Sequence, residues 1–129
     1  MGTMEALLDT SVLVGPEPST GTRLPDDAAI SVVTLAELWL GALVADALDE
    51  RATRLALLSE VQRRFEAIPV DGAVARGYGE LLAAARRRGG RPRPFDALIA
   101  ATAMVRGIPI YTRDRDFMRI PGVKVTLVR

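Results

Sequence analysis

Residues 93–117, RPFDALIAATAMVRGIPIYTRDRDF, join one carboxylate, a long apolar segment and a second pair of carboxylates. Pro94 fits the first position of a helix, and residues 97–105 are apolar on every side, which predicts a buried helix. Asp96 lies in the first turn of this helix, where free backbone N–H groups and the helix dipole favour a negative charge. A carboxylate in the first turn of a buried helix needs a physical reason, and the rest of the sequence is read for one.

The segment after this helix predicts a strand. Gly107 is suited to close the helix, and residues 108–111 predict a strand that ends in a polar turn over residues 112–117. A last strand is predicted over residues 123–128.

The chain upstream alternates between short apolar runs and helical patterns. It predicts strands over residues 6–8, 28–33 and 67–70, each followed by a helix, a further helix from Asp49, and a loop over residues 15–27. Strand–helix alternation with short connections predicts an α/β domain, specifically a three-layer α/β/α sandwich with a mostly parallel central sheet of about five strands.

Composition limits the chemistry. At 129 residues, with 49% hydrophobic and 26% charged residues, the chain fits a single globular domain over residues 1–129. The absence of cysteine excludes disulfides, thiolate zinc sites and a cysteine nucleophile, and the absence of histidine excludes serine–histidine catalysis and imidazole ligands. Catalysis would have to use carboxylates, hydroxyls, arginine or a metal ion.

The N-terminal sequence does not match an export signal. Glu5 and Asp9 interrupt the first apolar run, and no segment reaches 18 uncharged apolar residues. The sequence therefore predicts a cytoplasmic protein without a membrane segment.

The charges are divided unevenly along the chain. Residues 1–85 carry 6 basic and 13 acidic residues, a net charge of −7, whereas residues 86–129 carry 11 basic and 3 acidic residues, a net charge of +8. A basic surface with a few carboxylates suits a polyanionic substrate held against a bound cation. A solvated basic face is the alternative.

Four carboxylates are predicted to meet at one edge of the sheet. Asp9 follows the first strand, Glu37 lies just beyond the second, Asp96 opens the helix that leads into the fourth, and Asp114 follows the fourth. In a parallel sheet these positions share the carboxyl edge, and the four charges would repel one another unless a cation neutralised them. Oxygen-only ligands favour Mg²⁺ or Mn²⁺ over zinc.

Helix capping is the competing explanation for several of these residues. Asp9 or Thr10 would cap the next helix, residues 34–37 (TLAE) match a capping box that would account for Glu37, and Asp71 follows a strand in a position that we assign to capping.

The loop before Pro94 is rich in arginine. Five arginines lie within residues 86–93, more than a helix C-terminus with Gly89 as its cap needs. We expect Arg91 and Arg93 in this loop to contact phosphates.

Four sequence segments together resemble the motifs of PIN domains, in particular the bacterial VapC toxins of toxin–antitoxin pairs. They are LLDTSVLV with Asp9, TLAELWLGA with Glu37, PFDALIAATA with Asp96, and YTRDRDF with Asp114 and Asp116. The segments occur in the order and spacing of that family and span nearly the whole chain.

The resemblance implies a Mg²⁺- or Mn²⁺-dependent endoribonuclease that a cognate VapB antitoxin holds inactive. It implies catalytic and metal-binding roles for the four acids, with Asp116 as a further metal ligand and Asp114 or Asp116 facing the metal. Thr112 matches a hydroxyl residue beside the fourth acid and is assigned with Arg91, Arg93 and Arg113 to substrate binding. The family forms dimers, and an antitoxin segment places an arginine toward the acids.

Three other protein classes were considered. A phospho-acceptor receiver domain needs an adjacent acidic pair after its first strand and a lysine after a late one, but Asp9 stands alone and Lys124 falls inside the last strand. A haloacid-dehalogenase-type phosphatase needs Asp-x-Asp, and residues 9–11 are Asp-Thr-Ser. A non-catalytic PIN-like scaffold that binds RNA or a partner is the remaining alternative.

Overall fold

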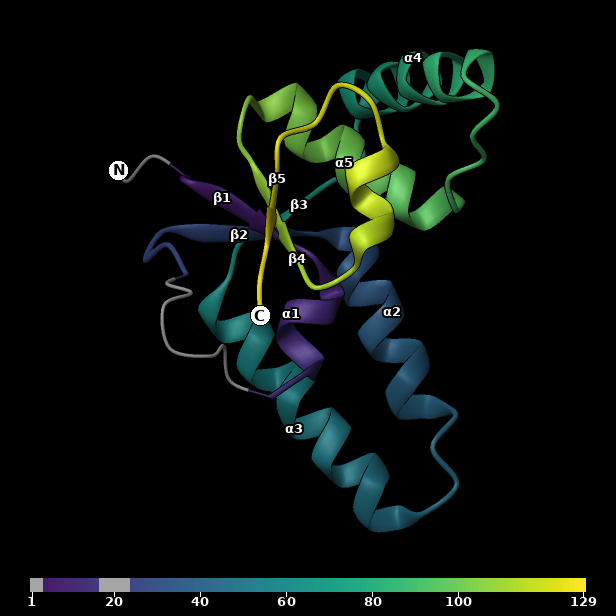
Figure 1. Ribbon diagram of the computed structural model, residues 1–129. Helices are drawn as coiled ribbons and strands as arrows, with labels where there is room; N and C mark the ends of the chain where they lie inside the picture. The colour runs from purple at the N-terminus through teal and green to yellow at the C-terminus, as the bar shows by residue number, and fades with distance from the viewer. Residues whose placement is uncertain (1–3, 17–23) are drawn as a thin grey trace.

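The computed structural model describes residues 4–16 and 24–129, and its centre is a five-stranded parallel sheet (Figure 1). The strand order is β3-β2-β1-β4-β5, and every neighbouring pair is parallel. The strands are β1 (Ala6–Leu8), β2 (Ala28–Ser31), β3 (Ala67–Ile68), β4 (Ile110–Thr112) and β5 (Val125–Leu127). The predicted five-stranded parallel sheet is confirmed.

Helices cover both faces of this sheet, as predicted for a three-layer sandwich. They are α1 (Thr10–Val14), α2 (Val32–Leu43), α3 (Leu48–Arg64), α4 (Gly72–Arg87) and α5 (Pro94–Arg106), with a 3-10 turn, η1 (Arg115–Arg119). Within the described residues, none of these helices has the length and apolar character that crossing a membrane requires.

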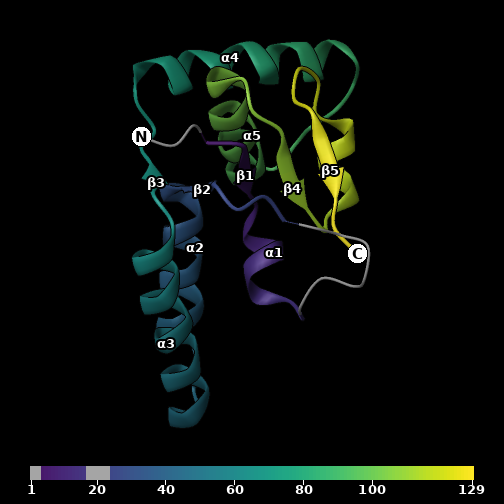
Figure 2. The same ribbon diagram turned by 90° about the vertical axis from the view of Figure 1, so that its left-hand side faces the viewer.

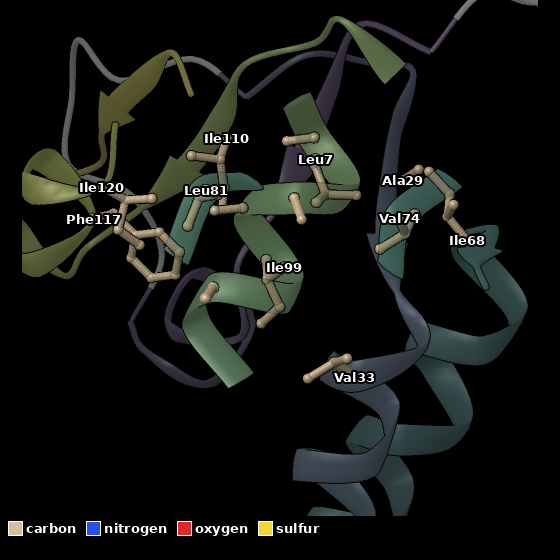
Figure 3. Packing of buried hydrophobic residues seen from close by; sticks show 14 residues of the cluster. Leu7, Ala29, Val33, Ile68, Val74, Leu81, Ile99, Ile110, Phe117 and Ile120 are labelled. Atoms are coloured by element: carbon tan, nitrogen blue, oxygen red, sulfur yellow. The ribbon is translucent and has the colours of Figure 1, made fainter. Parts of the chain in front are cut away.

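Successive residues of the central strand serve opposite layers. Leu7 belongs to the larger apolar cluster, which joins the sheet to α4 and α5 (Figure 3), and Leu8 belongs to the cluster formed with α2 and α3. Both side chains are at most 1% exposed. A strand buried on both faces has apolar residues at consecutive positions, which is why Ala6 to Leu8 shows no alternation.

The predicted buried helix is confirmed as α5. Ile99 and its alanine neighbours are shielded completely from solvent. Pro94 is its first residue, and Gly107 ends it with a left-handed φ of 66°, a conformation that glycine adopts without a steric penalty. Helix α4 packs along α5 on the outside of the molecule (Figures 1 and 2).

Helices α2 and α3 form an antiparallel pair that extends beyond the sheet, as Figures 1 and 2 show. Leu38 of α2 and Leu58 and Val61 of α3 are buried where the pair meets the sheet. Farther out, Leu40 and Leu48 are 62% and 82% exposed.

The capping box predicted over residues 34–37 is wrong. Helix α2 begins at Val32, and its N-cap is Ser31, whose hydroxyl accepts a hydrogen bond from Val33 N at 3.0 Å. The two valines read as the end of a strand because β-branched residues favour sheets, but the serine cap allows them to form the first helical turn. Thr34 is therefore an interior helical residue and is completely buried.

Other boundaries shift by a few residues. Strand β4 starts at Ile110 instead of residue 108, and the polar turn predicted after it contains the 3-10 turn η1. Of the loop predicted over residues 15–27, residues 17–23 lie outside the described part of the chain.

The capping role predicted for Asp71 is confirmed, since Asp71 Oδ1 accepts a hydrogen bond from Val74 N at 2.9 Å at the start of α4.

We expect Asp71→Ala to lower the free energy of unfolding by about 1 kcal/mol. Asp71→Asn should keep most of that stability because asparagine also caps helices. Urea denaturation of both variants measures this, and equal losses in the two would contradict the capping account.

Candidate active site

The strand order of the sheet has a topological switch point at the carboxyl ends of β1 and β4. From β1 the chain proceeds to β2 and β3 on one side, whereas β4 and β5 lie on the other side. Ligands of open α/β sheets bind at such a switch point. Asp9 follows β1 directly, and Thr112 is the last residue of β4.

Asp9 is 5% exposed and is held by one of its two carboxylate oxygens. Oδ2 accepts hydrogen bonds from the hydroxyls of Ser11 at 2.7 Å and Thr112 at 2.8 Å. It also caps α1 through Ser11 N at 3.4 Å, so the capping alternative for Asp9 holds together with its place at the switch point of the sheet. Within the described chain, Oδ1 accepts no hydrogen bond and is left for a ligand.

Thr112, which was assigned to substrate binding, is completely buried. Its hydroxyl donates to Asp9 and accepts from Asp114 N at 3.0 Å. The hydroxyl thus links the end of β1 to the turn after β4. The buried hydroxyl of Thr112 orients Asp9 and is out of reach of a polymer in solvent.

Asp96 and Asp114 share one arginine. Arg93 Nε donates to Asp96 Oδ2 at 2.7 Å, and Arg93 Nη2 donates to Asp114 Oδ2 at 2.7 Å. The side chain of Asp96 is 13% exposed and that of Asp114 is 29% exposed, whereas Arg93 is 66% exposed. Two partly buried carboxylates are thus neutralised by a cation that approaches from solvent.

Burial raises the pKa of Asp96 above that of an ordinary aspartate, and the hydrogen bond and charge of Arg93 oppose this rise. The negative charges of Asp9 and Asp114 raise the pKa of Asp96 further. Conversely, the hydrogen bond to Asp96, followed by the neighbouring carboxylate charges, raises the pKa of Arg93. Three acids of the cluster therefore act on one another through space.

Asp114 and Asp116 face different surroundings. Asp114 is the N-cap of η1, where its Oδ1 accepts from Asp116 N at 2.9 Å and its Oδ2 binds Arg93. Asp116 is exposed and lines a cavity of about 320 Å³ with Arg91, Arg93 and Arg119. Asp114 is thus the acid of this pair that joins Asp96.

Glu37 belongs to the same edge through a separate set of contacts. Its Oε1 accepts from the Thr10 hydroxyl at 2.7 Å, and the Thr10 hydroxyl also lies 3.0 Å from the Thr34 hydroxyl. Glu37 lines a cavity of about 460 Å³ together with Arg93, Phe95 and Asp96. Its position results from this hydroxyl chain and not from the predicted capping box.

The three arginines predicted to bind substrate lie in different places. Arg91 is exposed at the cavity of about 320 Å³, and Arg93 bridges the two acids. Arg113 is directed at the segment after α1, where its guanidinium donates to the Pro16 carbonyl.

The donor set suits a hard divalent cation, but the carboxylates are not arranged as a closed cage. Among the residues that the structure describes, no three acidic side chains come close enough together to hold a metal ion. Arg93 lies between Asp96 and Asp114 and places one positive charge beside these two acids. With oxygen donors only, Mg²⁺ or Mn²⁺ fits this position, and Arg93 would have to release the acids for it.

Comparison with known proteins identifies the family. The model of the PIN domain matches residues 6–123. Ribonuclease VapC5 of Mycobacterium tuberculosis is 41% identical over 129 residues, which cover 95% of this chain and 93% of that protein. Ribonuclease VapC4 of the same organism is 37% identical and is covered over its full length. The chain belongs to the VapC ribonucleases of the PIN domain family.

The solved structures agree with this assignment to the VapC family. The crystal structure of VapBC-5 from Mycobacterium tuberculosis, a member of the VapBC family of toxin–antitoxin systems, matches with a TM-score of 0.86 and 40% identity. The match covers 97% of this chain and 98% of that one. The predicted VapC-like fold is confirmed at this level of similarity.

The sequence did not predict that three residues of the VapC-like site position its acids. Thr10 was considered only as a helix cap and Ser11 was given no role, yet they fix Glu37 and Asp9. Thr34 was assigned to a helix cap, yet it lies beside Thr10. Hydroxyl residues directly after an active-site aspartate were the available signal. Their partners are set by contacts between α1 and α2 and between α1 and the end of β4.

Thr112→Val tests the positioning of Asp9. The variant keeps the side-chain shape and removes one of the two hydroxyls that hold Oδ2, so we expect the affinity for Mn²⁺ to fall about 10- to 100-fold. Thr112→Ser keeps the hydroxyl and should bind Mn²⁺ nearly as the unmodified protein does. Titration calorimetry measures both, and an unchanged affinity in Thr112→Val would show that the hydroxyl does not position Asp9.

Proposed function

We propose that this chain is the toxin of a type II toxin–antitoxin pair and acts, as a single nuclease domain over residues 1–129, as a Mg²⁺- or Mn²⁺-dependent endoribonuclease. The similarity to VapC ribonucleases supports the cleavage of RNA. The observation that carries the proposal is the pair of buried acids, Asp9 and Asp96, at the switch point of the sheet. A cellular RNA substrate also suits the predicted cytoplasmic location.

Asp9 and Asp96 are the proposed primary ligands of the cation. Counted over the whole residue, both are at most 9% exposed, and Asp9 keeps Oδ1 free of hydrogen bonds within the described chain. Glu37 and Asp114 are the proposed ligands of a second cation or of its water shell. Both are held by side-chain contacts, Glu37 by Thr10 and Asp114 by Arg93, and Glu37 lines the cavity of about 460 Å³. Asp116 lies farther out and is assigned to the outer shell.

A bound divalent cation supplies Lewis-acid chemistry, since it makes water a better nucleophile at neutral pH and neutralises charge on the reacting phosphate. The residues of the chain contribute orientation and charge. Glu37, fixed by Thr10, is placed to accept a proton from an attacking water. Arg93, once released from its two acids, remains close enough to bind a non-bridging phosphate oxygen.

The remaining arginines would hold the RNA backbone outside the cluster. Arg91 is exposed beside Asp96 and suits a phosphate contact. Arg113 would first have to leave the Pro16 carbonyl, so we assign it a secondary part.

A cognate VapB-type antitoxin and a second copy of the chain are the proposed protein partners. The solved VapBC-5 structure is a complex of this kind. Exposed apolar side chains around α1 and the α2–α3 pair offer a surface for protein contact: Val14, Trp39, Leu40, Leu43, Val44 and Leu48. The arginine bound between Asp96 and Asp114 also shows that the acids accept a guanidinium, which an antitoxin could supply.

Carboxylate-to-amide substitutions test the proposed chemistry. In Asp9→Asn, Asp96→Asn and Glu37→Gln the side-chain size is kept and one negative charge is lost, so we expect RNA cleavage in Mg²⁺ to fall to the level seen in EDTA. Mn²⁺ should restore cleavage by the EDTA-treated unmodified protein. Gel analysis of a labelled cellular RNA pool measures the cleavage.

Asp71→Asn is the matched control, because Asp71 is a capping aspartate after another strand and should cleave normally. Cooperative unfolding of each variant shows that the fold is intact. Full activity in Asp9→Asn or Asp96→Asn would refute the assignment. A lack of cleavage by the unmodified protein with any divalent cation would favour a non-catalytic scaffold.

A further inference from the structure

Two cavities meet at Arg93 and Asp96, and their linings differ in chemistry. The first, of about 460 Å³, contains the ring of Phe95 and Pro94 beside Glu37. The second, of about 320 Å³, lies between the loop that precedes α5 and the turn η1 and contains Arg91 and Arg119. The first cavity thus adds an aromatic ring to charged groups, and the second adds two further arginines beside Asp96 and Asp116.

Phe95 is an aromatic residue that stays accessible to solvent although it lies next to a buried acid. It directly precedes Asp96 in the first turn of α5, yet it is 48% exposed and belongs to neither apolar cluster of the described chain. The same turn therefore presents a buried carboxylate and an accessible aromatic ring. Every nucleobase has a flat face that stacks on such a ring, largely without regard to sequence.

Arg91 and Arg119 are both exposed and neither forms an ion pair or a side-chain hydrogen bond with the residues that the structure describes. Arg93, the third arginine of this cavity, is already bound to Asp96 and Asp114. Arg119 belongs to the turn that begins at Asp114, so its backbone is tied to the acidic cluster. Two unpaired guanidinium groups at a common cavity suit a phosphodiester.

We propose that RNA crosses the site with one nucleobase stacked on Phe95 and the phosphate of a neighbouring nucleotide bound between Arg91 and Arg119. This inference rests on the proposed ribonuclease function and adds two residues to it, Phe95 and Arg119. The reacting phosphate then lies at Asp96, where the two cavities meet. The ring selects the base position, and the arginines fix the direction of the backbone.

The test of the base position compares Phe95→Leu with Phe95→Tyr in the full-length protein. Leucine keeps an apolar side chain without a ring, and we expect it to raise KM for a cleaved RNA oligonucleotide about 5- to 150-fold with little change in kcat. Tyrosine keeps the stacking face and should retain KM. The dissociation constant of a uridine oligonucleotide of about ten residues, measured in Ca²⁺, should change in each variant in the same direction as KM.

The phosphate position is tested with Arg119→Gln against Arg115→Gln. Arg115 lies on the same turn but does not line the cavity, so its loss should leave KM unchanged. Arg119→Gln should raise KM and lower the slope of log affinity against log salt by about 0.7, the value for one phosphate contact with single-stranded nucleic acid.

The outcomes separate this inference from the function on which it rests. If the unmodified protein cleaves RNA but Phe95→Leu and Arg119→Gln match it in KM and oligonucleotide affinity, the two subsites are refuted and the nuclease stands. A fall in kcat alone would also refute them. If Phe95→Leu weakens only the complex with the cognate antitoxin, the ring contacts protein and not RNA. No cleavage by the unmodified protein would refute the function itself.

Discussion

The interaction on which the site depends is the repulsion among carboxylates at the carboxyl edge of one small sheet. Asp9 and Asp96 are almost fully buried, and Asp114 lies close enough to raise the pKa of Asp96. Burying an uncompensated charge costs several kcal/mol. The protein offsets this cost with the two hydroxyls on Asp9 and with the guanidinium of Arg93 shared by Asp96 and Asp114.

The fold makes this crowding unavoidable. Because every strand is parallel, the residues that follow β1 and β4 lie at the same edge, and the buried helix α5 begins there with Asp96. The stability of the domain comes from elsewhere, from the two apolar clusters on either side of the sheet. The scaffold can therefore sustain an electrostatically unfavourable edge, an arrangement typical of functional sites.

Much of this arrangement follows from local sequence signals. The fold was predictable because local signals mark its parts: the strands at Ala6 and Ile110, and the proline start and glycine end of α5. The same signals placed Asp9 and Asp96 at one edge of the sheet, where the charge of Asp9 acts on Asp96. The cap of α2 was not, because Ser31 competes with Thr34 for the same role and the outcome depends on where β2 ends.

Long-range contacts account for the remaining differences. Thr112 matches a position beside an acid, but only the pairing of β1 with β4 buries it against Asp9, 103 residues away in sequence. The same holds for Thr10 and Glu37, which meet across α1 and α2. A solvated basic face was the alternative for residues 86–129. Arg93 departs from it because it binds acids, whereas Arg91 is free of ion pairs within the described chain.

The central proposal is that a divalent cation held by Asp9 and Asp96 displaces Arg93 from its two acids when the enzyme is active. Anomalous diffraction from crystals of the toxin soaked in Mn²⁺ tests it most directly. The account predicts a manganese peak in contact with Asp9 and Asp96, with Arg93 turned away from both of its acids. Crystals that hold manganese only elsewhere, or that lack it while Arg93 still joins Asp96 to Asp114, would contradict the account.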